Sequence, residues 1–173
     1  EGFNASPATV TFTAGTSVNF QGVADAENLW RVISNGGSGN TLYFGDVDED
    51  SSPIPSYRGE TNGRVAGYAT LSGLQVGANG GVISFDSFLE TEQLAREFDQ
   101  VGVWIRHASV NGGNWVLLAT NAPGSGSIEI LNPNTNQLQT VSLDGLVRIP
   151  DPTTSAQRVA IELGAEYAGN IDF

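Results

Sequence analysis

Short runs of apolar residues, many of them alternating with polar ones, recur along the whole chain and are separated by clusters of Gly, Asn, Pro and Ser. In the clearest run, Val101, Val103 and Ile105 fall on one face and the residues between them on the other. A period of two is typical of a β-strand. The pattern predicts strands at residues 9–12, 17–20, 29–33, 41–44, 64–71, 82–89, 100–107, 115–118, 128–131, 138–143, 146–149, 158–163 and 171–173.

The number and spacing of these runs predict an all-β chain. Many short strands joined by turn-rich segments are typical of two antiparallel sheets packed as a jelly-roll sandwich. The length of 173 residues suits one domain, and no linker divides it, so we predict a single jelly-roll domain over residues 1–173. Residues 91–98 are the only helical candidate. Asn111-Gly112-Gly113-Asn114 predicts a hairpin turn, because Asn and Gly accept positive φ angles.

The acidic charge balance excludes some classes of binding partner. The net charge is −12, and all seven basic residues are arginines, so the chain lacks the basic surface that nucleic acids and anionic lipids attract. No apolar run is long enough to span a bilayer, and we expect no membrane insertion. Without cysteine the chain has no disulfides and no thiolate metal sites. The acidity favours divalent cations, with simple solubilisation or a halophilic origin as alternatives.

An acidic loop is the sharpest local feature. Asp46, Asp48 and Asp50 alternate in it, so their carboxylates point the same way if the loop is extended. Hard oxygen ligands of this kind suit calcium. The loop is not an EF-hand, because its sixth position is not Gly. We predict a calcium site here, against the alternative of a solvated acidic loop.

A second group of acids ends the strand at 82–89. Glu90 and Glu92 lie two apart, with Asp86 upstream on the same face. We assign Glu90 and Glu92 as candidate calcium ligands. They also fit the paired carboxylates of a glycosidase or a plain polar face at a strand end.

The single histidine limits catalysis. A Ser–His–Asp triad or a zinc site would have to use His107, and no Gly-x-Ser-x-Gly elbow surrounds a serine. His107 ends an alternating strand and fits an ordinary edge residue. We therefore expect no enzyme. Trp104, which alternates away from the apolar face of its strand, is the candidate ligand-binding residue: it stacks on sugars if that face is open and joins the core if a second sheet covers it.

Six short motifs follow one another between residues 29 and 121. They are Leu29-Trp30-Arg31-Val32, Gly39-Asn40-Thr41-Leu42-Tyr43-Phe44-Gly45, Gly63-Arg64-Val65-Ala66-Gly67, Ser84-Phe85-Asp86-Ser87-Phe88-Leu89-Glu90-Thr91-Glu92, Phe98-Asp99-Gln100-Val101-Gly102-Val103-Trp104-Ile105 and Asn111-Gly112-Gly113-Asn114-Trp115. Their order resembles the MAM-like, concanavalin-type jelly rolls of bacterial surface and secreted proteins. The resemblance implies an extracellular two-sheet module for adhesion, ligand contact or spacing, often with a structural calcium.

The chain also departs from that family. The cysteines of the animal MAM modules are absent, and the C-terminal third matches poorly. Bacterial members end near a Trp and two adjacent acids, whereas this chain ends in Gly169-Asn170-Ile171-Asp172-Phe173. A metal site that needs the missing acid is therefore not implied here.

The two ends of the chain suggest self-assembly. Read head to tail, Ile171-Asp172-Phe173 followed by Glu1-Gly2-Phe3 resembles the opening strand of this family. We predict that one copy's C-terminus lies beside another copy's N-terminus, in a tandem-repeat array or in a filament of subunits that complete each other's sheets. Coincidence across six residues is the alternative.

These observations combine into one functional prediction. We expect an extracellular or cell-surface structural or adhesive module, stabilised by calcium, whose partners are other copies of itself or neighbouring repeats. The first alternative is a carbohydrate-binding module with glycan partners. The second is a glycoside-acting enzyme that uses Glu90 and Glu92, and fold alone does not separate these functions.

Overall fold

The structure, a computed structural model, describes residues 69–89, 100–122, 125–151 and 153–173 in full, together with the backbone of five short strands before them. The chain divides into two compact units, residues 1–72 and 73–173, and each is described by itself. The single jelly-roll domain expected from the sequence stays a prediction.

Unit 1 contains only short, paired strands in its described part. β2 pairs with β5, β3 with β4, and β1 with the first three residues of β6, all antiparallel. The strands are β1 (Thr9–Thr11), β2 (Val18–Phe20), β3 (Trp30–Ser34), β4 (Asn40–Phe44), β5 (Arg64–Ala66) and β6 (Thr70–Val76), the last of which continues into unit 2.

The single strand predicted at residues 64–71 is wrong. β5 ends at Ala66 and β6 begins at Thr70, and the Gly67 between them is a residue that strands disfavour. β6 also runs further than predicted, to Val76. Gly73, which adopts a φ of 80°, interrupts the apolar alternation and hid the end of the strand from the pattern.

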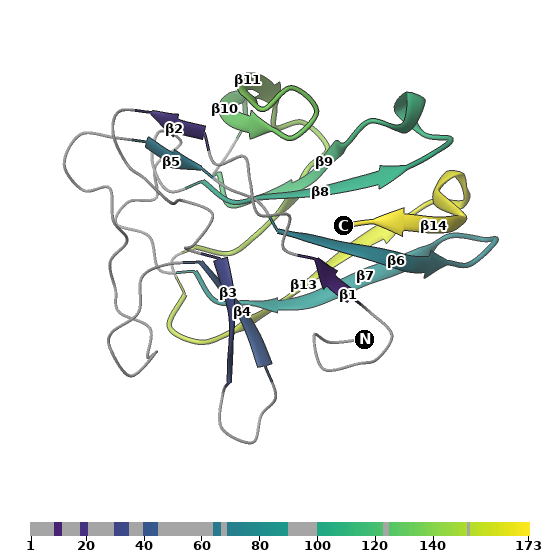
Figure 1. The fold of residues 1–173 in the computed structure, drawn as a ribbon, viewed down its shortest axis with the longest axis horizontal. Helices are drawn as coiled ribbons and strands as arrows, with labels where there is room; N and C mark the ends of the chain where they lie inside the picture. The colour runs from purple at the N-terminus through teal and green to yellow at the C-terminus, as the bar shows by residue number, and fades with distance from the viewer. Residues whose placement is uncertain are drawn as a thin grey trace. The chain divides into compact units, whose positions relative to one another are not determined.

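Unit 2 consists of strands and two 3₁₀ turns in its described part (Figure 1). The strands after β6 are β7 (Gly81–Ser87), β8 (Gly102–His107), β9 (Val116–Thr120), β10 (Ser127–Asn132), β11 (Gln137–Ser142), β12 (Val147–Arg148), β13 (Gln157–Leu163) and β14 (Gly169–Asp172). The turns are η2 (Asn111–Gly113) and η3 (Ala165–Tyr167). The all-β prediction is confirmed for the part of the chain that is described.

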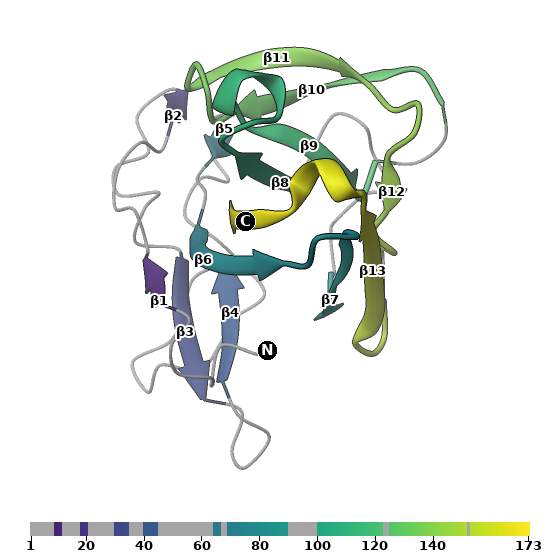
Figure 2. The ribbon, with the colours of Figure 1, turned by 90° about the vertical axis from the view of Figure 1, so that its right-hand side faces the viewer.

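Three sheets make up the described part of unit 2. The largest has the strand order β6-β14-β8-β9-β12, and β1 of unit 1 pairs with the start of its β6. β14 and β9 run antiparallel to β8, whereas β12 runs parallel to β9. β13 and β7 form a second, antiparallel sheet, and β10 and β11 form a hairpin. Figure 2 shows this hairpin lying over β8 and β9.

The main core lies between the large sheet and the β13–β7 sheet. Alternation along each strand sends every second side chain into it, as the period of two requires. Its buried residues come from both sheets, from η3 and from the position just after β12: Ile105, Ala119, Ile149, Val159, Ile161, Leu163, Tyr167 and Ile171. Two sheets that share one core fit a sandwich. The jelly-roll connectivity stays a prediction.

A second, smaller core lies under the β10–β11 hairpin. Ile128 and Ile130 of β10 pack there, with Trp104 of β8 and Leu117 of β9 half-buried beside them. At Gly102, a Cβ atom would come within 2.6 Å of the Ile130 Cδ1 atom. A larger residue at position 102 would therefore make the side chains beneath the hairpin shift. β8 and β9 are thus covered on both faces at this end, and left uncovered by the hairpin further along.

The turn predicted at residues 111–114 is confirmed. Asn111, Gly112 and Gly113 have φ angles of 49°, 66° and 81°, all in the left-handed region. This region favours Gly and tolerates Asn. Asn114 closes the turn through its backbone N–H and its side-chain amide, which both donate to the Asn111 carbonyl oxygen. The turn carries Trp115 to the start of β9.

Candidate functional site

Most of the residues predicted to bind calcium or to mediate assembly lie outside the described part of the chain. Nothing in the structure tests them, so both functions stay predictions. These residues are Asp46, Asp48, Asp50, Glu90, Glu92, Glu1, Gly2 and Phe3. The helical candidate at residues 91–98 also lies outside the described part.

Trp104 lies beneath the β10–β11 hairpin. Its side chain packs against the small core that contains Ile128, Ile130 and Leu143. The sequence left open whether this face was free or covered. It is covered, and the cover is a hairpin rather than the second main sheet. A role for Trp104 in ligand binding stays a prediction, and a ligand stacked on its ring would have to share this space with the hairpin.

The three C-terminal residues make contacts within unit 2. Ile171 is 2% exposed and belongs to the main core. Asp172 forms an ion pair with Arg106, and the Phe173 ring lies 5.8 Å from the Phe85 ring, centroid to centroid. β14 has β6 on one side and β8 on the other, so it offers no edge for strand addition. A copy that adds a strand would have to use a different edge.

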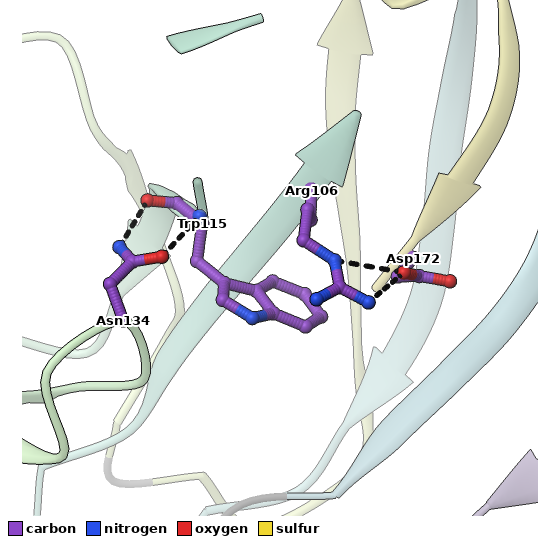
Figure 3. A network of polar contacts seen from close by, with 4 residues as sticks. All are labelled: Arg106, Trp115, Asn134 and Asp172. Atoms are coloured by element: carbon purple, nitrogen blue, oxygen red, sulfur yellow. Dashed lines mark hydrogen bonds and ion pairs between the residues drawn. The ribbon is translucent and has the colours of Figure 1, made fainter. Parts of the chain in front are cut away.

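Arg106 is the centre of a polar network on the uncovered face of the large sheet (Figure 3). It lies directly opposite Asp172 in the antiparallel pairing of β8 with β14. Its Nη2 and Nε atoms donate to Asp172 Oδ2 at 2.5 and 3.0 Å. The guanidinium carbon lies 4.9 Å from the centroid of the Trp115 ring, within the range of a cation–π contact. The guanidinium is thus held between a carboxylate and an indole.

Asn134, in the turn between β10 and β11, fixes the backbone of Trp115. The Trp115 N–H donates to Asn134 Oδ1 at 2.7 Å, and Asn134 Nδ2 donates to the Trp115 carbonyl oxygen at 3.0 Å. The Asn134 N–H in turn donates to Asn132 Oδ1 at 2.8 Å. One amide side chain therefore satisfies both backbone groups of Trp115 and ties the hairpin to the start of β9.

Two further polar residues share this face. Asn170 lies two positions before Asp172 on β14, so period two places both on the same side of the sheet. Gln75 of β6 donates a hydrogen bond from Nε2 to Asn170 Oδ1. Asn170, Gln75 and Arg106 are exposed, whereas Asp172 and Trp115 are half-buried. The face therefore carries planar polar groups from three neighbouring strands, next to an indole.

His107 has structural contacts. Its Nδ1 atom accepts a hydrogen bond from the Ser109 N–H at 3.3 Å, and its ring meets the Tyr167 ring edge-on with centroids 6.4 Å apart. β8 lies inside the sheet, so His107 marks the end of an inner strand rather than a sheet edge. Burial, followed by the negative charge of Glu166, raises the pKa of the Tyr167 phenol above its ordinary value.

A buried polar pair holds the far end of the sheet. Asn121, 7% exposed, accepts from the Val101 N–H at 2.8 Å and donates to Asp151 Oδ2 at 2.9 Å. This pair joins the start of β8, the end of β9 and the segment after β12. Sequence reasoning missed it, because neither residue stands out in composition or spacing.

Comparison with models of known protein families, with curated protein sequences and with solved structures found no match. The resemblance to MAM-like jelly rolls therefore stays a prediction. Among the described residues, no group of three or more His, Cys, Asp or Glu side chains is placed to hold a metal ion. That same part of the chain contains no helix of the length and apolarity needed to cross a bilayer.

Proposed function

We propose that the chain is an extracellular structural or adhesive module and not an enzyme. The observation that carries the proposal is that three polar side chains of the described part, His107, Arg106 and Asp172, make contacts that hold strands in place. His107, the single histidine, uses Nδ1 to accept a backbone N–H. Arg106 and Asp172 bind each other. General acid–base catalysis needs such groups within reach of a substrate proton, whereas a structural module uses them to fix strands.

Calcium is part of the proposal. The motivation is the alternation of Asp46, Asp48 and Asp50 and the spacing of Glu90 and Glu92 in a chain of net charge −12. A ligand that binds only the folded state stabilises it by about 2.7 kcal/mol at a hundredfold excess over its Kd. The melting temperature of the wild type should rise with calcium and fall with chelator. Asp48→Asn should lose most of this response, while Asp144→Asn, in a separate turn, keeps it.

Self-assembly is tested by the particle size in solution. Light scattering of the purified chain with calcium, and again after chelation, distinguishes the two outcomes. Large particles that dissolve on chelation would support a calcium-dependent structural polymer. A monomer in both conditions would contradict assembly and leave adhesion to another molecule as the remaining form of the proposal.

A further inference from the structure

The uncovered part of the large sheet carries a continuous set of polar groups. We call it the polar strip and define it as Gln75, Asn170, Asp172, Arg106 and Trp115. Contacts link its members in two groups: a hydrogen bond joins Gln75 to Asn170, while an ion pair joins Asp172 to Arg106 and a cation–π contact joins Arg106 to Trp115. Asn170 and Asp172 lie two positions apart on β14 and bring the two groups together. The hairpin covers the Trp104 end of the same face, so the strip is the part left open to solvent.

The strip offers donors and acceptors in alternation. The Arg106 guanidinium has five N–H donors, and only its Nε and Nη2 atoms donate to Asp172. Carboxylate and amide oxygens beside it accept hydrogen bonds, and the amide nitrogens donate. A sugar hydroxyl both donates and accepts, so neighbouring hydroxyls on one ring match this arrangement. The planar guanidinium, backed by an indole, gives a flat surface on which the C–H face of a sugar ring can pack.

The charge of the strip favours neutral glycans over acidic ones. Asp172 lies 2.5 Å from Arg106 and cancels its charge, and the chain as a whole carries −12. Like charges across an interface oppose binding, so polyanions such as acidic polysaccharides are disfavoured. The strip crosses four strands, β6, β14, β8 and the start of β9. At a strand spacing of about 4.8 Å this is about 15 Å, enough for several linked sugar units.

We propose that the polar strip binds a neutral polysaccharide. The inference rests on the adhesive function proposed above and names what the module adheres to. It places the glycan contact of the alternative carbohydrate-binding function at Arg106 and Trp115 instead of Trp104. The positioning of Trp115 by Asn134 keeps the strip in one arrangement before the ligand arrives, which lowers the ordering cost of binding.

The test is affinity gel electrophoresis of the full chain. Native gels contain one neutral polysaccharide each (mixed-linkage β-glucan, xyloglucan or galactomannan) or an acidic one, alginate. The wild type should be retarded by at least one neutral polymer and not by alginate. Arg106→Gln and Asp172→Asn should weaken that binding by about tenfold or more, because a hydrogen bond to a charged group contributes about 1.5–3 kcal/mol.

Arg158→Gln is the matched control. Arg158 lies opposite Asp86 on the β13–β7 sheet, in an ion pair of the same type but outside the strip. It should leave retardation unchanged. If Arg106→Gln weakens the fold, Gln75→Ala and Asn170→Ala replace exposed side chains and keep the test open. Circular dichroism confirms that each variant is folded.

Two results would overturn the inference: retardation by none of the neutral polymers, or equal retardation of the wild type, Arg106→Gln and Asn170→Ala. Failure of the proposed function gives a different result. Reducing ends released from the polysaccharides would contradict a non-catalytic module, whether or not the gels show binding. Assembly seen by light scattering, with no retardation in the gels, would contradict glycan binding by the polar strip and leave the structural function standing.

Discussion

Two ion pairs in unit 2 have the same composition, and each joins residues directly opposite each other on antiparallel strands, but their surroundings differ. Arg106 faces Asp172 across β8 and β14, and Arg158 faces Asp86 across β13 and β7. Arg158 makes the better fork, because its Nε and Nη2 atoms reach both carboxylate oxygens at 2.8 and 3.2 Å. Arg106 directs two nitrogens to a single oxygen.

Although Arg158 has the better hydrogen-bond geometry, the Arg106 pair is the less exposed of the two. The Arg158 and Asp86 side chains are 63% and 56% exposed, whereas those of Arg106 and Asp172 are 46% and 24% exposed. An exposed ion pair contributes about 0–1 kcal/mol, since solvent screens it. Arg106 adds a cation–π contact, which contributes about 0.5–1 kcal/mol at an exposed site. We therefore expect the Arg106 pair to contribute more to stability than the Arg158 pair, because of its surroundings and not because of its hydrogen-bond geometry.

The largest expected effect is on the core beneath the Arg106 pair. Ile171 is 2% exposed and lies between Asn170 and Asp172 on β14. Ile171→Ala should lower the free energy of unfolding by about 2–5 kcal/mol through lost burial and a cavity. Asn170→Ala, the neighbouring exposed position, should change it by about 0.5 kcal/mol or less. Urea unfolding measures both. Similar small losses for the two variants would show that β14 is not part of the core.

The next largest effect is expected at the two arginines. Arg106→Gln should cost about 1–2 kcal/mol of unfolding free energy, and Arg158→Gln less than about 1 kcal/mol. Double-mutant cycles with Asp172→Asn and Asp86→Asn isolate each pair. A larger coupling energy for Arg158 with Asp86 would contradict the role given to the surroundings. Added salt should weaken the Arg158 pair more, because exposed charges are screened more strongly.

Removing the support of Trp115 should have a smaller effect. Asn134→Ala deletes both hydrogen bonds to the Trp115 backbone. Because Asn134 is exposed, we expect a loss of about 0.5–1 kcal/mol, at the low end for hydrogen bonds. Thr135→Ala in the same turn is the control, since Thr135 contacts the turn through its backbone N–H, which donates to the Asn132 carbonyl oxygen. Tryptophan fluorescence, to which Trp115 contributes together with Trp30 and Trp104, should shift in the first variant and not in the second. An unchanged spectrum in both would mean that Asn134 does not position the indole.

The smallest effect appears only at alkaline pH. Because burial raises the pKa of Tyr167, the folded state keeps this proton to higher pH than the unfolded state does. Its contribution to stability is therefore complete below the unfolded value of about 10 and is lost as the pH rises through the folded value. Tyr167→Phe should flatten the decline of stability above about pH 10. An unaltered decline in urea unfolding would contradict this assignment.

Sequence patterns located the strands of unit 2 well and the polar strip poorly. Alternation at Val101, Val103 and Ile105 predicted β8, because the core imposes a local period of two. The pairing of Arg106 with Asp172 joins residues 66 positions apart, and no local pattern encodes which strands become neighbours. The alternation of β8 showed that Trp104 faces away from the main core. It could not show that a hairpin covers Trp104, because that hairpin begins at residue 127, far along the chain.

We propose above that unit 2 presents a non-catalytic adhesive face centred on Arg106 and Asp172. The most direct test is the detachment of chain-coated beads, under flow, from a surface that carries the neutral polysaccharide bound most strongly in the gels. We expect that beads with the wild type or Arg158→Gln stay attached, and that beads with Arg106→Gln wash away. Equal attachment of all three, or of none, would contradict it.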